Sequence, residues 1–159
     1  MKKIILLSCA LILGVGSAFA QKGSKAVGLN LGYGTEIKSL GIGGKFQYSI
    51  LDELRIEPSM NFYMKKKGLS MWDASFNVHY LVPLMQNLKM YPIFGLTYTK
   101  WKQKNVLEGS KIQNNFGANI GVGAEYHLSY NFLVNLDVKY QAVKKYGQAV
   151  FTFGAAYKF

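Results

Sequence analysis

The sequence predicts an all-β fold, an eight-stranded antiparallel up-and-down transmembrane β-barrel. Eight runs of residues alternate between apolar and polar side chains, and the apolar positions of the last three runs carry aromatic residues near both ends. Because successive residues of a strand face opposite sides, each run would have one apolar and one polar face. Strands of about ten alternating residues with aromatic girdles at both interfaces are typical of outer-membrane barrels.

The clearest alternation lies in the last third of the chain, which ends on an aromatic residue. It predicts the strands Phe116–Tyr126, Phe132–Gln141 and Phe151–Phe159. Their apolar positions are Phe116, Ala118, Ile120, Val122, Ala124 and Tyr126, then Phe132, Val134, Leu136, Val138 and Tyr140, then Phe151, Phe153, Ala155, Tyr157 and Phe159.

Five earlier runs complete the set, separated by short turn sequences. Pro58 cannot donate to a β-ladder, so we expect a bulge or a frayed position there. The lysine-rich stretch Trp101–Gln113 shows no alternation and is expected to be the longest connection. The five predicted strands are Ala26–Gly34, Leu40–Ile50, Leu54–Met64, Ser70–Val82 and Lys89–Lys100.

The N-terminal residues have the features of a secretory signal peptide. Two lysines precede the apolar run Ile4–Val15, and Ala18-Phe19-Ala20 supplies a small-x-small cleavage pattern. No later run reaches the roughly 20 apolar residues that a membrane helix needs. We therefore expect a signal peptide at residues 1–20 and a single barrel domain at residues 21–159.

The one cysteine, Cys9, lies inside the predicted signal peptide. Leu6-Leu7-Ser8-Cys9 loosely resembles a lipoprotein box, but only about five apolar residues precede it. Cleavage would leave a chain without thiols, which excludes thiol catalysis and thiolate metal sites. It would also remove two lysines and no acid, so that the formal charge falls from +11 to +9. For an exported chain without a basic helix, this charge favours an anionic membrane surface over nucleic acid.

The polar faces of the predicted strands favour a membrane barrel over a soluble one. A soluble surface would be roughly 25–35% charged. These faces are instead rich in glycine, which suits the crowded lumen of a narrow barrel that eight strands just fill. The glycines concerned are Gly28, Gly32, Gly43, Gly95, Gly117, Gly121, Gly123 and Gly154.

The connections between the strands are also sorted by charge. If the N-terminus lies in the periplasm, alternate connections face outside and contain most of the lysines. The other connections hold Asp52, Glu53, His127 and, at one edge, Lys89. The outward-facing lysines are Lys38, Lys65, Lys66, Lys67, Lys102, Lys104, Lys111, Lys144 and Lys145.

The expected mature chain resembles the small eight-stranded outer-membrane barrels of the OmpX and OmpW type and the OmpA transmembrane domain. The resemblance rests on the signal peptide, the eight alternating strands, the aromatic girdles and the end Ala155-Ala156-Tyr157-Lys158-Phe159. Met90–Gly95 also resembles the fifth strand of such proteins. The resemblance implies that Tyr157 and Phe159 form an assembly signal, read by the barrel-assembly machinery with periplasmic chaperones. It further implies a monomer without cofactors, and it brings no catalytic motif.

His127-Leu128-Ser129 has the His-x-Ser spacing that resembles outer-membrane lipid A deacylases. The expected topology places this pair in a periplasmic turn, away from the outer leaflet. The acid of those enzymes follows about a dozen residues on, where Gln141 stands, and Asp137 would point into the lumen. We therefore expect a solvated turn and no enzyme activity.

Inside the expected barrel, charges of both signs face the lumen. They form either a selectivity constriction or a packed network that neutralises itself, and we expect the second. Arg55 and Lys158 are expected to reach Glu57, Glu125 or Asp137. His79 is expected to be a hydrogen-bonded filler beside Ser75 and Asn77, because no second metal ligand accompanies it. The lumen-facing charges are Lys45, Arg55, Glu57, Asp73, Glu125, Asp137, Lys139 and Lys158.

The outward lysines would lie just above the girdle, against the phosphate-bearing lipopolysaccharide of a Gram-negative outer leaflet. Polybasic segments near anionic membranes gain about 1 kcal/mol per lysine, less at high salt. We therefore expect contacts between lipopolysaccharide and Lys65, Lys66, Lys67, Lys102, Lys104, Lys111, Lys144 and Lys145. The expected function is a non-conducting barrel with a structural or surface-interaction role. The alternatives are a lipid-modifying enzyme and a transporter of small hydrophobic compounds.

Overall fold

The computed structural model describes residues 23–66, 68–105, 109–144 and 147–159, so the predicted signal peptide lies outside the described residues. The described chain is built from strands and contains no helix long and apolar enough to cross a membrane. The strands are β1 (Lys25–Gly34), β2 (Ser39–Ser49), β3 (Leu54–Lys66), β4 (Leu69–Tyr80), β5 (Val82–Pro83), β6 (Leu88–Asn105), β7 (Gly109–His127), β8 (Phe132–Val143) and β9 (Gln148–Lys158).

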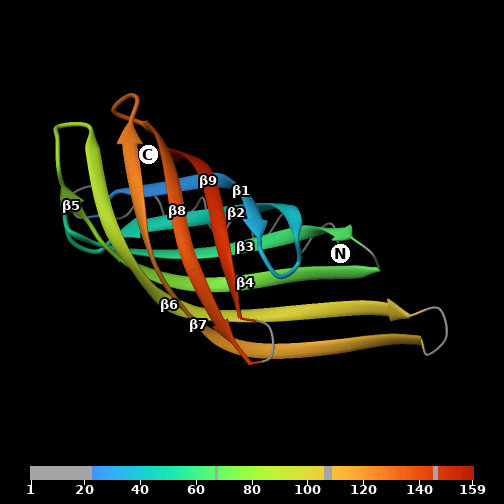
Figure 1. The fold of residues 1–159 in the computed structure, drawn as a ribbon. Coiled ribbons are helices and arrows are strands. Elements are labelled where there is room, and N and C mark those ends of the chain that lie inside the picture. The colour runs from blue at the N-terminus through green and yellow to red at the C-terminus, as the bar shows by residue number, and fades with distance from the viewer. Residues whose placement is uncertain (1–22, 67, 106–108, 145–146) are drawn as a thin grey trace, which may run out of the picture.

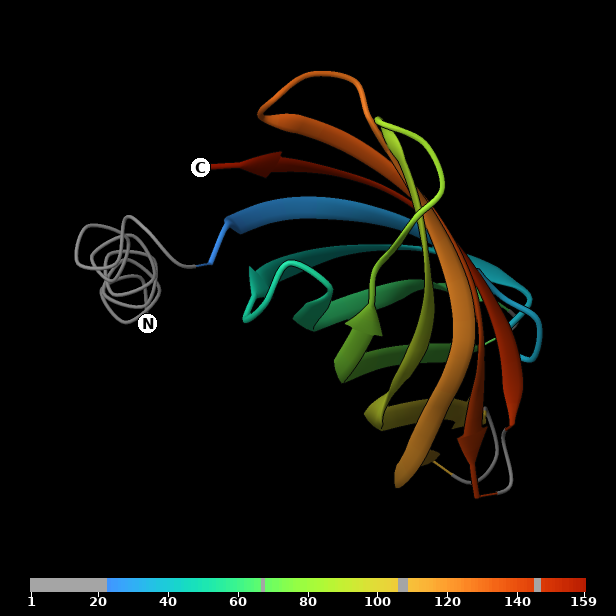
Figure 2. The ribbon, with the colours of Figure 1, turned by 90° about the vertical axis from the view of Figure 1, so that its left-hand side faces the viewer.

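The strands form one closed antiparallel barrel (Figures 1 and 2). Each long strand pairs with its neighbour in the chain, β9 returns to β1, and β4 pairs with β6. The two-residue β5 follows Leu81 and pairs with the start of β6, so eight long strands make the wall. The predicted eight-stranded up-and-down barrel is confirmed.

The wall is inverted relative to a soluble protein, with apolar side chains outside and polar side chains inside. In β1, Leu29 is 67% exposed whereas its neighbour Asn30 is 4% exposed. The same alternation runs through the other long strands. Such an apolar outer face is stable where it contacts lipid instead of water.

The hairpin formed by β6 and β7 is longer than the sequence predicted. The ladder continues from Trp101 opposite Gln113 to Asn105 opposite Gly109, so the predicted unpatterned connection Trp101–Gln113 is wrong. Lysine and other polar residues replace most apolar residues on its outer face, which removes the hydrophobic period while the backbone ladder persists. Pairing of β7 with β8 begins only at Gly117, and the hairpin reaches beyond its neighbours in Figure 1.

Pro58 interrupts the ladder without producing a bulge. Between β2 and β3, Lys45 pairs with Ser59 and Tyr48 pairs with Ile56 in an unchanged register, and the positions between them are skipped. The predicted frayed position is therefore confirmed. The irregularity in the register lies instead between Tyr63 and Lys66, where β3 meets β4.

The pairing of β4 with β6, which closes the barrel, depends on a close backbone approach at Gly95. A Cβ added there would lie against the carbonyl oxygen of Phe76 and 2.8 Å from the Cα of Asn77. Overpacking of this kind costs about 1–3 kcal/mol. Gly95→Ala should therefore lower the free energy of unfolding by that amount, measured by urea unfolding of the detergent-refolded protein.

Gly44→Ala is the matched control, because Gly44 faces outward and its nearest surrounding atom is the Gly28 carbonyl oxygen at 3.9 Å. It should leave stability unchanged or raise it by up to about 1 kcal/mol, since glycine weakens a strand. Equal losses of unfolding free energy in Gly95→Ala and Gly44→Ala would contradict a close approach of β4 and β6 at Gly95.

Candidate functional site

The lumen is the first candidate site, and its two ends differ. The end that carries residues 23–25 and Phe159 is called the terminal end here, and the opposite end, with the turn at Lys38, is called the lysine end. Buried side chains fill the lumen in three layers between them. Charged groups lie toward the terminal end, amides and hydroxyls lie in the middle, and an apolar plug lies toward the lysine end.

An ion pair between β3 and β7 forms the centre of the charged layer. Nη1 of Arg55 lies 2.5 Å from Oε2 of Glu125, and the two side chains are only 4% and 1% exposed. Nη2 of Arg55 lies 3.2 Å from Nδ1 of His79, and its guanidinium carbon lies 5.0 Å from the ring centroid of Tyr91. Arg55 is therefore held by contacts to three other strands.

The network continues across the lumen to β8 and β2. The Tyr91 hydroxyl donates to Asp137 at 2.5 Å, and Asn135 donates to the same carboxylate at 2.8 Å. Lys45 donates to Asn135, and its Nζ lies 4.0 Å from Glu57. The bonds from Tyr91 to Asp137 and from Lys45 to Asn135 link strands that are not neighbours in the wall, so the charged layer crosses the lumen.

His79 and His127 both belong to this layer. The ring of His79 stacks on Tyr91 with centroids 4.6 Å apart, in keeping with the expected filler role. His127 is the last residue of β7, and its Nε2 lies 3.1 Å from Oε1 of Glu125. The expected solvated turn at His127 is therefore wrong, because strand alternation continues one residue further and places His127 on the same face as Glu125.

The other predicted lumen charges lie outside this cluster. Asp73 is in the middle layer, where Asn61 and Ser75 donate to it at 3.0 and 3.3 Å. Lys139 is buried on β8. Lys158 lies at the terminal mouth with its Nζ 5.4 Å from the Tyr130 ring centroid, so it packs on the β7–β8 turn instead of making the ion pair expected of it.

The mouth at the terminal end opens into a cavity of about 580 Å³. Its lining includes Arg55, Glu125, His127 and Lys158. Arg55 and Glu125 of the charged layer therefore form part of the wall of this cavity.

The middle layer is held by hydrogen bonds, some between neighbouring strands and some across the barrel. Asn119 donates to Asn77 at 2.9 Å, and the hydroxyls of Ser75 and Thr97 lie 3.0 Å apart. Gln148 donates to Gln141 at 2.9 Å and to the Met71 sulfur on the opposite side at 3.4 Å.

The apolar plug consists of Ile37, Tyr63, Met71 and Trp101, each at most 5% exposed. The sequence analysis missed it. Ile37 comes from a turn, and Trp101 lies in the stretch that was taken for a connection. Extending the inward positions of β6 beyond Thr99 would have found Trp101. The plug closes the lumen at the lysine end.

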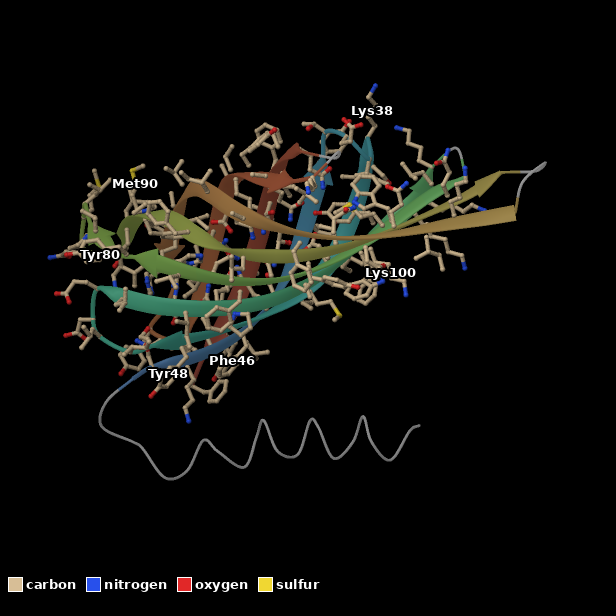
Figure 3. The ribbon with its side chains drawn as sticks, turned by 90° about the horizontal axis from the view of Figure 1, so that it is seen from below. Lys38, Phe46, Tyr48, Tyr80, Met90 and Lys100 are labelled. Atoms are coloured by element: carbon tan, nitrogen blue, oxygen red, sulfur yellow. The ribbon has the colours of Figure 1, made fainter. Side chains whose placement is uncertain are left out.

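The second candidate site is the outer surface of the lysine end. Six described lysines of its connections and of the β6–β7 hairpin are exposed, and one described acid, Glu36, accompanies them. Lys38 and Lys100 lie toward one end in Figure 3, with Tyr48, Tyr80 and Met90 toward the other. Lys67, Lys145 and the side chain of Lys104 lie outside the described residues. The six are Lys38, Lys65, Lys66, Lys102, Lys111 and Lys144.

Two further features concern the chain end and metals. Tyr157 and Phe159 expose half of their surface on the outer face, and the Phe159 N–H donates to the Lys25 carbonyl at 2.9 Å. No cluster of three or more metal-ligating side chains exists among the described residues.

Comparison with solved structures identifies the same architecture in bacterial outer-membrane proteins. The N-terminal β-barrel domain of Pseudomonas aeruginosa OprF is 20% identical, with a TM-score of 0.73 over 87% of this chain and 100% of that chain. Neisserial surface protein A is 15% identical, with a TM-score of 0.69 over 86% and 97%. Yersinia pestis Ail, the attachment invasion locus protein, is 15% identical, with a TM-score of 0.60 over 86% and 97%.

At these identities the structural likeness shows the fold alone. No curated protein matches the chain. The family model for the outer membrane protein beta-barrel domain, however, matches residues 7–159, almost the whole sequence. The chain therefore belongs to the family of outer-membrane proteins built on this β-barrel domain.

Proposed function

We propose that this protein is a non-conducting integral barrel of the outer membrane, anchored against lipopolysaccharide, with a structural or surface-interaction role and no enzyme activity. The observation that carries the proposal is the filled lumen. The charged layer lies toward one end of the lumen and the apolar plug toward the other, and both support the proposal of a lumen without a continuous polar path. Eight-stranded barrels have interiors about wide enough for side chains alone.

The lysine end faces the cell exterior in this proposal, and the terminal end faces the periplasm. The exposed lysines of the lysine end would then lie at the level of the phosphates of lipopolysaccharide. Polybasic segments gain about 1 kcal/mol per lysine from an anionic surface. Ail has also been solved in complex with the heparin analogue sucrose octasulfate, an anionic ligand on a barrel of the same fold.

Biogenesis completes the proposal. Residues 1–20 would be a cleaved signal peptide, and Tyr157 with Phe159 would be read by the barrel-assembly machinery after periplasmic chaperones deliver the chain. Tyr157 and Phe159 lie on the outer, lipid-facing side of the folded barrel, so their rings are not needed to fill the lumen. The folded product would be a monomer.

The geometry does not favour the two alternatives. A lipid-modifying enzyme needs its histidine and serine facing lipid near the outer leaflet, whereas His127 faces the lumen at the terminal end and contacts Glu125. A transporter of hydrophobic compounds needs a gap in the wall. Every neighbouring pair of long strands is instead joined by a ladder of paired residues.

The Arg55–Glu125 pair provides the test of a packed, closed lumen. Removing one member of a buried pair costs about 3–5 kcal/mol, because the partner charge stays desolvated. Glu125→Gln should therefore lower the urea midpoint of unfolding by a corresponding amount. The control Glu53→Gln, in an exposed turn, should not change it.

Planar-bilayer recordings of the parent protein should show no stable channels, because the layers close the lumen. Discrete ion-selective conductance that Glu125→Gln alters would show that the charged layer is a filter. That result would replace the proposed function with a transport function.

The lysine end provides the test of lipopolysaccharide contact. Lys65/Lys144→Gln removes two exposed lysines from the lysine end, and Lys89/Lys158→Gln removes two half-buried lysines from the terminal end. At about 1 kcal/mol per lysine, the first variant should lose roughly 30-fold in lipopolysaccharide affinity at low salt, with a shallower salt dependence. The second variant should bind like the parent. Equal behaviour of both variants would show that the position of the lysines does not matter.

A further inference from the structure

A groove lies in the wall at the lysine end, beside the apolar plug, whose Tyr63 and Met71 are also among its lining residues. It has a volume of about 360 Å³. On its outward side it is lined by Phe62 of β3, Ser70 and Trp72 of β4, Lys100 and Lys102 of β6 and Ile112 of β7. No acid is among its lining residues.

Strand register explains how these six residues come together. Phe62 lies opposite Trp72, and Trp72 lies opposite Lys100, so the three form one row across the wall. One step closer to the lysine end, Ser70 lies opposite Lys102, which lies opposite Ile112. Side chains directly opposite on paired strands have Cβ atoms about 4.5–5.5 Å apart. The two rows therefore form one continuous surface.

The irregular register between Tyr63 and Lys66 borders this surface. Tyr63 pairs with Met71, but the next pair joins Lys66 to Leu69, so β3 carries an extra residue beside Ser70. Bulges of this kind bend the strand and are frequent beside functional sites. This irregularity lies beside Ser70, which is opposite Lys102, so it borders the row of the groove nearest the lysine end.

An aromatic band continues from the groove toward the centre of the wall. The ring centroids of Trp72 and Tyr98 are 5.7 Å apart, and those of Tyr98 and Phe116 are 4.9 Å apart. From Tyr98 the outward side of β6 continues through the exposed Leu96 and Phe94. The groove thus has an apolar floor that joins the lipid-facing surface, and the cations of Lys100 and Lys102 at its rim toward the lysine end.

We propose that this groove binds one acylated and phosphorylated glycolipid of the outer leaflet. A lipid phosphate lies between Lys100 and Lys102, and an acyl chain lies along Phe62, Trp72 and Tyr98. The inference deepens the proposed function, on which it rests, by naming one saturable site in place of a diffuse charged surface.

The apolar floor selects a lipid over a soluble polyanion. Lys100 and Lys102 are two residues apart on one strand, so their Cα atoms are about 6.8 Å apart and both point outward. They can contact one phosphate together. The aromatic floor below them contributes favourably to binding only when an apolar chain covers it and removes it from water.

The experiment uses the full barrel in phosphatidylcholine nanodiscs that contain bisphosphorylated lipid A. After transfer to detergent, native mass spectrometry counts the lipid A molecules that remain bound. The parent should retain one. Lys100/Lys102→Gln should lower the affinity of the barrel for lipid A by roughly 30-fold, because it removes two lysines that neutralise the lipid phosphate. Lys100/Lys102→Arg should restore retention, because arginine keeps the charge.

Lys65/Lys144→Gln is the matched control for the site. It should keep the one retained lipid A, although its salt-dependent surface binding weakens. Loss of the retained lipid in Lys65/Lys144→Gln and not in Lys100/Lys102→Gln would overturn the site and leave the proposed function intact. Loss in neither variant, with unchanged surface binding, would overturn both.

A competition arm separates the lipid from soluble phosphate. Inositol hexakisphosphate supplies phosphates without acyl chains and should leave the retained lipid A in place. Displacement of lipid A by it at comparable concentration would show that the groove recognises phosphate alone. The heat-dependent gel mobility of each variant checks that the barrel has folded.

Discussion

Closure of the backbone ladder is the constraint on which the rest of this structure depends. In lipid, a peptide group without a hydrogen-bond partner costs several kcal/mol, so a strand can cross only when both of its edges are paired. The pairing of β4 with β6 supplies the last ladder and leaves no free edge in the wall. Pro58 cannot donate a hydrogen bond, and the β2–β3 ladder skips the positions beside it. Gly95 has no side chain, which allows β4 and β6 to approach each other closely.

Closure with only eight strands in turn determines what the lumen can contain. The interior is about as wide as the side chains that project into it, so every inward residue must fit its neighbours across the barrel as well as along the wall. The charged groups are tolerated there because each of the central ones meets a partner, such as Glu125 for Arg55 and Asn135 for Lys45.

The strands could be predicted from sequence because lipid on one side and a polar lumen on the other produce a strict period of two. Where lipid ends, the period ends too, so the tip of the β6–β7 hairpin was taken for a connection. The lumen charges could be assigned to a face and a depth by alternation. Their partners could not be assigned, because the tilt of the strands decides which residues meet across the barrel, as Lys45 and Asn135 illustrate. Of the plug, Ile37 comes from a turn and leaves no periodic signal, whereas Trp101 continues the inward period of β6. The groove lies beside a register irregularity that the period also does not indicate.

The central claim is that outward side chains meet lipid and inward side chains meet a closed lumen, and the two tryptophans of the chain report on it directly. Trp72 faces outward, whereas Trp101 lies in the plug and is 2% exposed. Fluorescence would be recorded for Trp101→Phe and Trp72→Phe, each with one remaining tryptophan, in bilayers of brominated lipid and with iodide in the water. Brominated lipid should quench Trp72 strongly and Trp101 weakly, and iodide should not reach Trp101. Stronger lipid quenching of Trp101 than of Trp72, or ready quenching of Trp101 by iodide, would contradict the account.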